Sequence, residues 1–310
     1  MILTVTANAA IDKRYVVEGF GIEKVNRVKE CLVSAGGKGL NVARVAELMG
    51  EKAIVTGFVG GHAGDFIAQE MEERQIRNQF VWCQGESRTC INMWDERSHQ
   101  QTELLESGIS VCQEDCRRLV GTVEELLPLC KVAVISGSAP KGAGPGLYKE
   151  LIRAAKAAKK PVILDTSGVL LEECLLERPV MIKPNIDEIR ALTGKPMNSR
   201  EALIRAARDL HEDGIETVAI SLGGEGSLVS SQEGVFDVKV PKLQAVNTVG
   251  CGDSMIAGFA VGMVRGLGME ETIRLASAVS AANALRQETG FIVKEDVEAL
   301  LPQIRIKKIR

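Results

Sequence analysis

Short apolar runs alternate along this chain with longer segments in which apolar residues recur at helical spacing. The apolar runs predict β-strands at Ile2–Thr6, Ala53–Val59, Val132–Ser136, Val162–Asp165, Met181–Lys183 and Thr217–Ser221. The segments with helical spacing predict helices at Gly64–Arg74, Glu114–Leu127, Gly146–Ala158 and Arg200–Asp213. Repeated alternation of this kind predicts an α/β fold, a doubly wound, mostly parallel sheet flanked by helices, with ligands bound at the carboxyl ends of the strands.

Two segments interrupt this alternation. Asp12–Leu32 contains extended, mixed polar and apolar stretches without a helical period. Arg88–Leu105 contains two strand patterns, Thr89–Trp94 and Gln101–Leu105, joined by a polar turn. Together these pieces predict a small β-sheet that projects from the core, either as a lid over a ligand site or only as surface hairpins. We expect one domain over residues 1–310, with the lid formed by about 12–34 and 87–107.

Composition supports the α/β prediction and excludes several classes of function. Of the 310 residues, 45% are hydrophobic, 4% are aromatic and 31 are glycine, which is typical of a close-packed parallel sheet and not of an all-β sandwich. The formal net charge is -3 and the charges are interspersed, so we expect no nucleic-acid partner. The eight cysteines form no CxxC pair and the three histidines are far apart, which argues against a zinc site.

The sequence also predicts where the protein works. The N-terminal stretch MILTVTANAAID reads as a strand and lacks the positively charged start of a signal peptide. The longest apolar run, Met255–Val264, has about half the length that a membrane-spanning helix needs. We therefore expect no membrane partner and a cytoplasmic protein whose cysteines are reduced and mostly buried.

A glycine-rich segment near the C-terminus, Asn247–Ser254, gives the strongest functional signal. Gly250 and Gly252 flank Cys251, and Asp253 then opens an apolar helix. Such a helix start gathers free backbone N–H groups and the positive end of the helix dipole, which suits an anion. A carboxylate beside an anion site is electrostatically costly, but it is useful if Asp253 takes a proton during phosphoryl transfer. Equally, Asp253 could simply cap the helix.

A second glycine cluster, Gly36-Gly37-Lys38-Gly39-Leu40-Asn41, also runs into a predicted helix. It is not a P-loop, because Lys38 is followed by glycine and not by Ser or Thr. The glycines allow a ligand to approach the backbone, Lys38 offers a positive charge and Asn41 offers a donor and an acceptor. A tight turn into a packed helix is an equally good explanation. Asp12, after the first strand, could accept sugar hydroxyls or form a turn.

Two pairs of polar residues have the spacing of ligand-binding groups. Arg88 and Asn92 share one face of a predicted strand and could face either a phosphate or solvent. Asn185 and Glu188 are three residues apart at a predicted helix start. They could hold water around a magnesium ion or form a capping box.

Two loops after predicted strands complete the set of candidates. The polar loop Ser136–Gly142 contains Ser138, but no histidine lies near it in the sequence and no GxSxG motif is present, so a hydrolase nucleophile is not supported. The glycine turn in Ile220–Ser227 suits either a nucleotide or a hairpin.

Taken in order, these segments resemble the ribokinase-like carbohydrate kinases of the phosphofructokinase B family over essentially the whole chain. Gly36–Val42 is similar to the N-terminal signature of that family, and Asn247–Ser254 is similar to the C-terminal one. The Gly-Gly-Lys-Gly motif, with its lysine, resembles the motif of the family branch that contains 1-phosphofructokinases and tagatose-6-phosphate kinases. Val25–Val28, Gly85–Ile91 and Gln101–Glu106 look more like the tagatose-6-phosphate kinases.

The resemblance implies an ATP- and Mg2+-dependent kinase that converts a ketohexose monophosphate to the bisphosphate. It favours tagatose 6-phosphate as the small-molecule substrate and leaves a 1-phosphofructokinase as the alternative. A fructose-6-phosphate kinase and a non-catalytic sugar-phosphate sensor are further alternatives. A homodimer that forms through the lid is also expected.

The resemblance also implies residue roles. Asp253 is the expected base, and the N–H groups of Gly250, Cys251 and Gly252 form the expected anion hole. Asp12, Gly37 and Asn41 are expected to hold the sugar, with Glu103 and Ser138 near it. Lys38, Arg88 and Asn92 are expected to bind the phosphate that the sugar already carries. Magnesium is expected at Asn185 and Glu188, and ATP at Lys183, Asn185, Ser221, Gly223, Gly226, Thr248 and Asn283, the last near the adenine. The chain departs from the family pattern at Ala9, usually Pro, and at Cys251, usually Ala; neither change removes a charged group.

Overall fold

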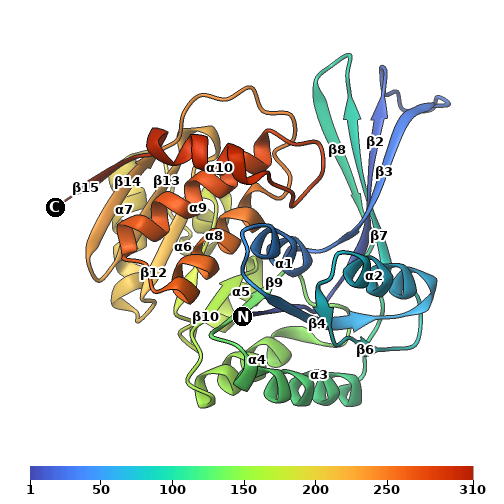
Figure 1. Ribbon diagram of the computed structural model, residues 1–310, viewed down its shortest axis with the longest axis horizontal. Coiled ribbons are helices and arrows are strands. Elements are labelled where there is room, and N and C mark those ends of the chain that lie inside the picture. Colours follow the sequence, from blue (N-terminus) through green and yellow to red (C-terminus); the bar gives the residue numbers. More distant parts are fainter. Residues whose placement is uncertain (310) are drawn as a thin grey trace.

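The central layer of the protein is one large sheet, seen in a computed structural model that describes residues 1–309 (Figure 1). Its strand order is β15-β14-β13-β12-β11-β10-β9-β1-β4-β5, and β6 also pairs with β4. The parallel strands are β1 (Ile2–Thr6), β4 (Ala53–Val59), β5 (Arg77–Asn78), β6 (Val81–Trp82), β9 (Val132–Ser136), β10 (Val162–Asp165), β11 (Met181–Ile182) and β12 (Thr217–Ser221). An antiparallel extension follows, made of β13 (Ser227–Ser231), β14 (Gly234–Lys239) and β15 (Arg305–Ile309). The predicted doubly wound α/β fold is confirmed, and all six predicted strands are present.

Helices cover both faces of this sheet, because successive strand residues point to opposite sides and both sides are apolar. Ile2 packs toward one group of helices and Leu3 toward the other. The first group is α1 (Lys38–Leu48), α2 (Gly61–Glu73), α8 (Cys251–Arg265), α9 (Met269–Ala284) and α10 (Lys294–Leu300). The second is α3 (Gln113–Leu126), α4 (Gly144–Ala157), α5 (Gly168–Leu175), α6 (Ile186–Thr193) and α7 (Arg200–Glu212). Short 3-10 turns lie at Leu127–Leu129, Gly223–Glu225 and Leu301–Gln303.

A small sheet stands apart from these layers and projects from the body of the molecule (Figure 1). It consists of β3 (Val28–Gly36), β2 (Ala10–Val17), β7 (Arg88–Asp95) and β8 (Gln100–Leu105), in that order. β2 and β7 are parallel, and the outer pairs are antiparallel. The two insertions in the sequence therefore do form one sheet, with strands slightly longer than the pattern predicted.

The apolar run Met255–Val264 lies inside α8, which is buried between α1, α9 and the sheet. Glycine allows α8 and α9 to approach closely, since a Cβ on Gly258 would lie 2.4 Å from the Cα of Ala276. Within residues 1–309, no helix is both long and apolar enough to cross a membrane.

Candidate active site

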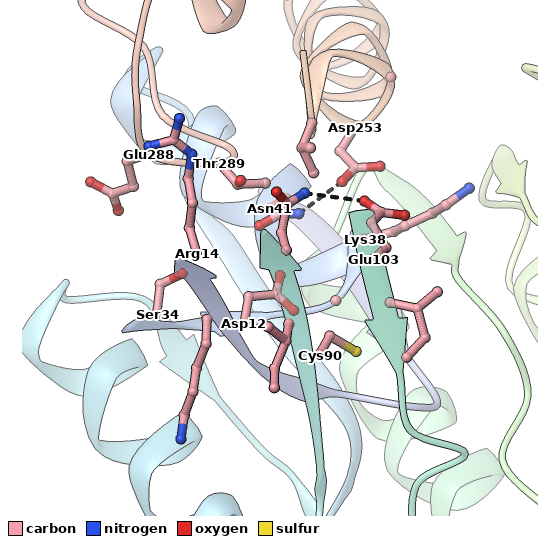
Figure 2. A pocket seen from close by; sticks show the side chains of 18 of the residues that line it. Asp12, Arg14, Ser34, Lys38, Asn41, Cys90, Glu103, Asp253, Glu288 and Thr289 are labelled. Carbon is pink, nitrogen blue, oxygen red and sulfur yellow. Dashed lines mark hydrogen bonds between the residues drawn. The ribbon is translucent and has the colours of Figure 1, made fainter. Parts of the chain in front are cut away.

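A cavity of about 600 Å³ lies between the small sheet and the carboxyl ends of the parallel strands (Figure 2). Most of the residues singled out in the sequence meet there, although they come from segments far apart in the chain. Those that line the cavity are Asp12, Gly37, Lys38, Asn41, Arg88, Asn92, Glu103, Lys183, Asn185, Glu188, Ser221, Gly250, Gly252 and Asp253. Ligand binding at this edge of the sheet follows from the topology, because parallel strands end there together.

The start of α8 has the geometry of an anion site. Gly250 precedes the helix with a φ of 79°, and a Cβ there would lie 2.8 Å from the backbone nitrogen of Gly290, so the position requires glycine. The N–H of Cys251 makes a 3.3 Å bond to the carbonyl of Thr248. The N–H of Gly252, in the next position, lies at the open end of the helix beside Lys183, whose Nζ would be 3.1 Å from a Cβ on Gly252.

Asp253 does not cap this helix, so the capping interpretation is wrong. The N-cap residue of α8 is Gly250, and no side chain makes a capping hydrogen bond there. The Asp253 carboxylate is buried and accepts a 2.8 Å hydrogen bond from Nδ2 of Asn41. Burial raises the pKa of Asp253, while the nearby ammonium of Lys38 opposes that rise. A buried carboxylate with a raised pKa at an anion site is suited to accept a proton from a hydroxyl.

The orientation of Asn41 is fixed from behind by Arg44, which is 2% exposed. Nη1 of Arg44 donates to Oδ1 of Asn41 at 3.2 Å and to the carbonyl of Thr289 at 2.8 Å. Its Nη2 donates to the carbonyl of Ala35, at the end of β3, at 2.6 Å. Because Arg44 occupies the Asn41 oxygen, the amide nitrogen of Asn41 must face Asp253. Sequence reasoning overlooked Arg44. By helical spacing alone, Arg44 is simply another residue on the buried face of α1.

Asp165 is the second overlooked residue. It ends β10, is 2% exposed and lies 3.2 Å from Nζ of Lys38 and 3.6 Å from Nζ of Lys183. Burial alone would raise the pKa of Asp165, but the two lysines bring it below its usual value. Despite opposing burial, Asp165, Asp253 and Glu188 raise the pKa of Lys38 and keep it charged. The signal was available, since Asp165 is the last residue of a predicted strand, where ligands bind.

Asn185 and Glu188 form the capping box that the spacing allowed. The N–H of Glu188 donates to Oδ1 of Asn185, and the N–H of Asn185 donates to Oε2 of Glu188, both at 2.8 Å. Both residues also line the cavity. The box uses one carboxylate oxygen of Glu188, so the other remains free for a water or a cation.

The donor set here fits magnesium only in a particular way. Within residues 1–309, no group of three or more His, Cys, Asp and Glu side chains could hold a metal. Magnesium commonly binds proteins through one or two carboxylates and keeps several waters and substrate phosphate oxygens. Glu188 with the side chain of Asn185 is compatible with that mode.

On the opposite wall, the small sheet presents polar side chains to the cavity. Asp12 lies inside β2 and not in a turn, and burial raises its pKa to about 6, opposed by Arg44 and Arg88. Arg88 begins β7, and its Nε and Nη1 donate to the carbonyls of Asn8 and Glu106. Asn92 donates from Nδ2 to Oε1 of Glu103 on the neighbouring strand at 3.2 Å.

The other sequence-selected residues lie outside the cavity wall. Cys251 and Thr248 belong to the loop that shapes the start of α8, and burial raises the pKa of the Cys251 thiol to about 11. The side chain of Ser138 accepts a hydrogen bond from Asn8. Gly223 and Gly226 form the hairpin between β12 and β13, which was the alternative to a nucleotide loop. A Cβ on Gly223 would meet open space, whereas one on Gly226 would lie 2.0 Å from the carbonyl oxygen of Val238.

Asn283 does not have the position expected for an adenine contact. Its side chain is 0% exposed. Nδ2 donates to the carbonyl of Val249 and to Sγ of Cys251, and Oδ1 accepts from Ser254 and from the N–H of Gly290. All of its polar atoms are thereby used to hold the glycine loop, and none is left for a nucleotide.

Comparison with known proteins fits this geometry. The profile of the pfkB family carbohydrate kinases matches residues 3–296. The chain belongs to the pfkB family. It is therefore a carbohydrate kinase, a phosphotransferase with an alcohol group as acceptor and ATP as the expected phosphoryl donor.

Three pfkB relatives illustrate the range of the similarity. A tagatose-6-phosphate kinase of Staphylococcus epidermidis is 38% identical over 312 residues, and the match covers 100% of both chains. A structure titled as a possible 1-phosphofructokinase of Thermotoga maritima has a TM-score of 0.92 and 26% identity, with 100% of both chains covered. Phosphofructokinase-2 of Escherichia coli in complex with potassium has a TM-score of 0.90 and 26% identity, covering 97% of this chain and 98% of that one.

Proposed function

We propose that this pfkB kinase transfers the γ-phosphoryl group of ATP to a ketohexose monophosphate, with tagatose 6-phosphate as the preferred substrate. The observation that supports the proposal most is the position of Asp253, buried beside Asn41 at the start of α8 and near Lys38 in the same cavity. The relative with 38% identity, named as a tagatose-6-phosphate kinase, supports the choice of sugar.

In the proposed reaction, Asp253 takes the proton of the acceptor hydroxyl. The hydroxyl oxygen then forms a bond to the γ-phosphorus while the bond between that phosphorus and the bridging oxygen of ADP breaks. The N–H groups at the start of α8 and the side chain of Lys183 stabilise the negative charge on the transferring group. Lys38 neutralises charge between the sugar and the nucleotide, and Asp165 keeps both lysines in place.

The substrates are proposed to enter from two sides of Asp253. The sugar contacts Asp12, Gly37 and Asn41, with Glu103 near it, while the nucleotide lies toward Asn185 and Ser221. Gly223, Gly226 and Thr248 do not line the cavity, and their role is proposed to be shaping the backbone of the loops beside the nucleotide. Asn185 and Glu188 would hold magnesium, whose charge would offset that of the ATP phosphates. Ser138 and Asn283 are proposed to hold the loops of the site and not to contact ligands.

The test is a coupled ADP-release assay over a panel of ketohexose phosphates and free ketohexoses, ranked by kcat/KM. We expect tagatose 6-phosphate to rank first. In the same assay Asp253→Asn should lower kcat by at least ~10³, because a general base contributes roughly 10²–10⁴, while ATP affinity changes little. Wild-type turnover in Asp253→Asn would refute the assignment of the base.

The same panel separates the alternatives. The structural match to a possible 1-phosphofructokinase makes fructose 1-phosphate the second candidate. Fructose 6-phosphate ranking first would instead indicate a fructose-6-phosphate kinase. A protein that binds sugar phosphates but releases no ADP would be a sensor and would contradict the proposal.

A homodimer through the small sheet and a cytoplasmic location stay predictions. The small sheet has exposed apolar residues on its outer strands, among them Val28, Val33 and Leu104. Such an edge is suited to pairing with a second copy of the chain.

A further inference from the structure

The cavity contains more positive charge than the reaction uses, and most of it already has a partner. Six basic residues line the cavity: Lys13, Arg14, Lys38, Arg74, Arg88 and Lys183. Lys38 and Lys183 pair with Asp165, and Arg74 pairs with Glu70 and Glu288. Nε and Nη1 of Arg88 donate to two backbone carbonyls, which leaves its Nη2 for a ligand.

Arg14 is the exception on the inner face of the small sheet. Its guanidinium takes part in no salt bridge or side-chain hydrogen bond within residues 1–309, and the side chain is half-buried. Burial lowers the pKa of Arg14, and Glu30 opposes that effect. A partly desolvated guanidinium without a counter-ion attracts an anion more strongly than an exposed one.

The strand register places Arg14 among the polar side chains of the sugar side. Arg14 is two residues after Asp12 on β2 and therefore shares its face. Its direct partner on β7 is Asn92, whose own partner on β8 is the carboxylate Glu103. In Figure 2, Arg14 extends toward the side of Glu288, whereas Lys38 and Asp253 lie on the other side of Asn41. Arg14 and Asp253 thus line the cavity on opposite sides of Asn41.

We propose that Arg14 binds the phosphate group that the substrate already carries, with Asn92 and the free Nη2 of Arg88 beside it. This inference rests on the proposed function and identifies its substrate as a sugar that is phosphorylated at the end remote from the acceptor hydroxyl. A phosphate monoester offers oxygens that match the fork of a guanidinium in a bidentate contact. Lys38, already held by Asp165, then serves the transferring group and not the substrate phosphate.

The test compares Arg14→Ala and Arg14→Lys with Arg97→Ala, a control that removes an exposed guanidinium from the same small sheet, in the turn between β7 and β8, at a residue that does not line the cavity. Binding of tagatose 6-phosphate is measured by calorimetry in the presence of a non-hydrolysable ATP analogue. Arg14→Ala should raise Kd about 10- to 100-fold, as expected for the loss of a charge-assisted contact. Arg14→Lys should recover part of the affinity, and Arg97→Ala should stay within about twofold of the wild type.

Two results would overturn the assignment. One is an Arg14→Ala protein that binds tagatose 6-phosphate as the wild type does. The other is an Arg14→Ala protein that binds the ATP analogue more weakly but binds the sugar phosphate normally, which would mean that Arg14 contacts the nucleotide.

Failure of the proposed function is recognised separately. If the wild type releases no ADP with any sugar phosphate, the kinase proposal fails, and titration with inorganic phosphate still tests Arg14. Weaker phosphate binding by Arg14→Ala than by Arg97→Ala supports the site, whereas equal binding refutes it. If the wild type turns over and Arg14→Ala has an unchanged KM, only the Arg14 inference fails.

Discussion

At the scale of single residues, the carboxylate of the proposed base, Asp253, depends on Arg44, a side chain that does not line the cavity. Arg44 bonds to the oxygen of Asn41, and the nitrogen of Asn41 bonds to Asp253. The donated N–H favours the carboxylate form and so lowers the pKa of Asp253, against the stronger opposing effect of burial. Arg44 is therefore the proposed positioning residue for Asp253.

Replacing Arg44 should change the pH dependence of catalysis. In Arg44→Met, Asn41 is free to turn its amide, so the pKa of Asp253 rises. As the pH falls, the carboxylate is then protonated at a higher pH than in the wild type. We expect the acid limb of the kcat profile to move up by roughly one pH unit, the effect of one hydrogen bond to a charged group. Rate measurements from pH 5 to 9 provide the check.

Arg74→Met is the matched control for this prediction. Arg74 pairs with Glu70 and Glu288 in the same network but does not contact Asn41. The Arg74→Met variant should therefore keep the acid limb of the kcat profile at the wild-type pH. A purely structural role of Arg44 would lower the active fraction without moving the midpoint of the profile.

At the scale of elements, the approach of α8 to α9 sets the position of the anion site. The two helices touch backbone to backbone at Gly258, so the start of α8 is fixed by packing along its whole length. A displaced α8 would move Gly252 and Asp253 relative to Lys183. The packing of the helix pair thus fixes the geometry of the proposed site, although the helix contact lies inside the core.

Gly258→Ala should destabilise the protein, because its Cβ would lie 2.4 Å from the Cα of Ala276 and 3.0 Å from its nitrogen. Backbone atoms cannot yield as a side chain can, so we expect a loss of about 1–3 kcal/mol in the free energy of unfolding. Gly121→Ala in α3 is the control, because nothing lies within 4 Å of its Cβ. That variant should gain about 0.5–1 kcal/mol. Similar urea midpoints for both variants would contradict the close helix contact.

At the scale of the whole molecule, the small sheet supplies one wall of the cavity and also the proposed dimer contact. Asn92 and Glu103 line the cavity, whereas Leu104, the next residue along β8, does not. Leu104 is 54% exposed. One sheet can therefore bind substrate on one face and a second chain on the other.

If that face is the dimer contact, Leu104→Glu should convert the protein to a monomer, because the change puts a charge into an apolar interface. Sedimentation velocity of the wild type and the variant measures the change. Leu176→Glu is the control, since Leu176 is 78% exposed but follows α5, away from the small sheet. A monomeric wild type, or a Leu104→Glu protein that remains dimeric, would rule out this contact.

The sequence alone determined the strands, the parallel α/β architecture and the glycine segments around Lys38 and Asp253. These features are local, because strand patterns, glycine turns and helix starts are written within a few consecutive residues. For this reason the structure has the predicted bounds in five strands: Ile2–Thr6, Ala53–Val59, Val132–Ser136, Val162–Asp165 and Thr217–Ser221. The family signatures are local in the same sense.

Only the tertiary structure decided which partner each polar group has. It placed Asp165 between two lysines, turned Asn41 toward Asp253, gave Asn283 to the glycine loop and left Arg14 without a counter-ion. Asn41 and Asp253 are 212 residues apart in the chain. Their contact exists because α1 and α8 pack side by side on one face of the sheet. Long-range packing selects this arrangement, and no short segment specifies it.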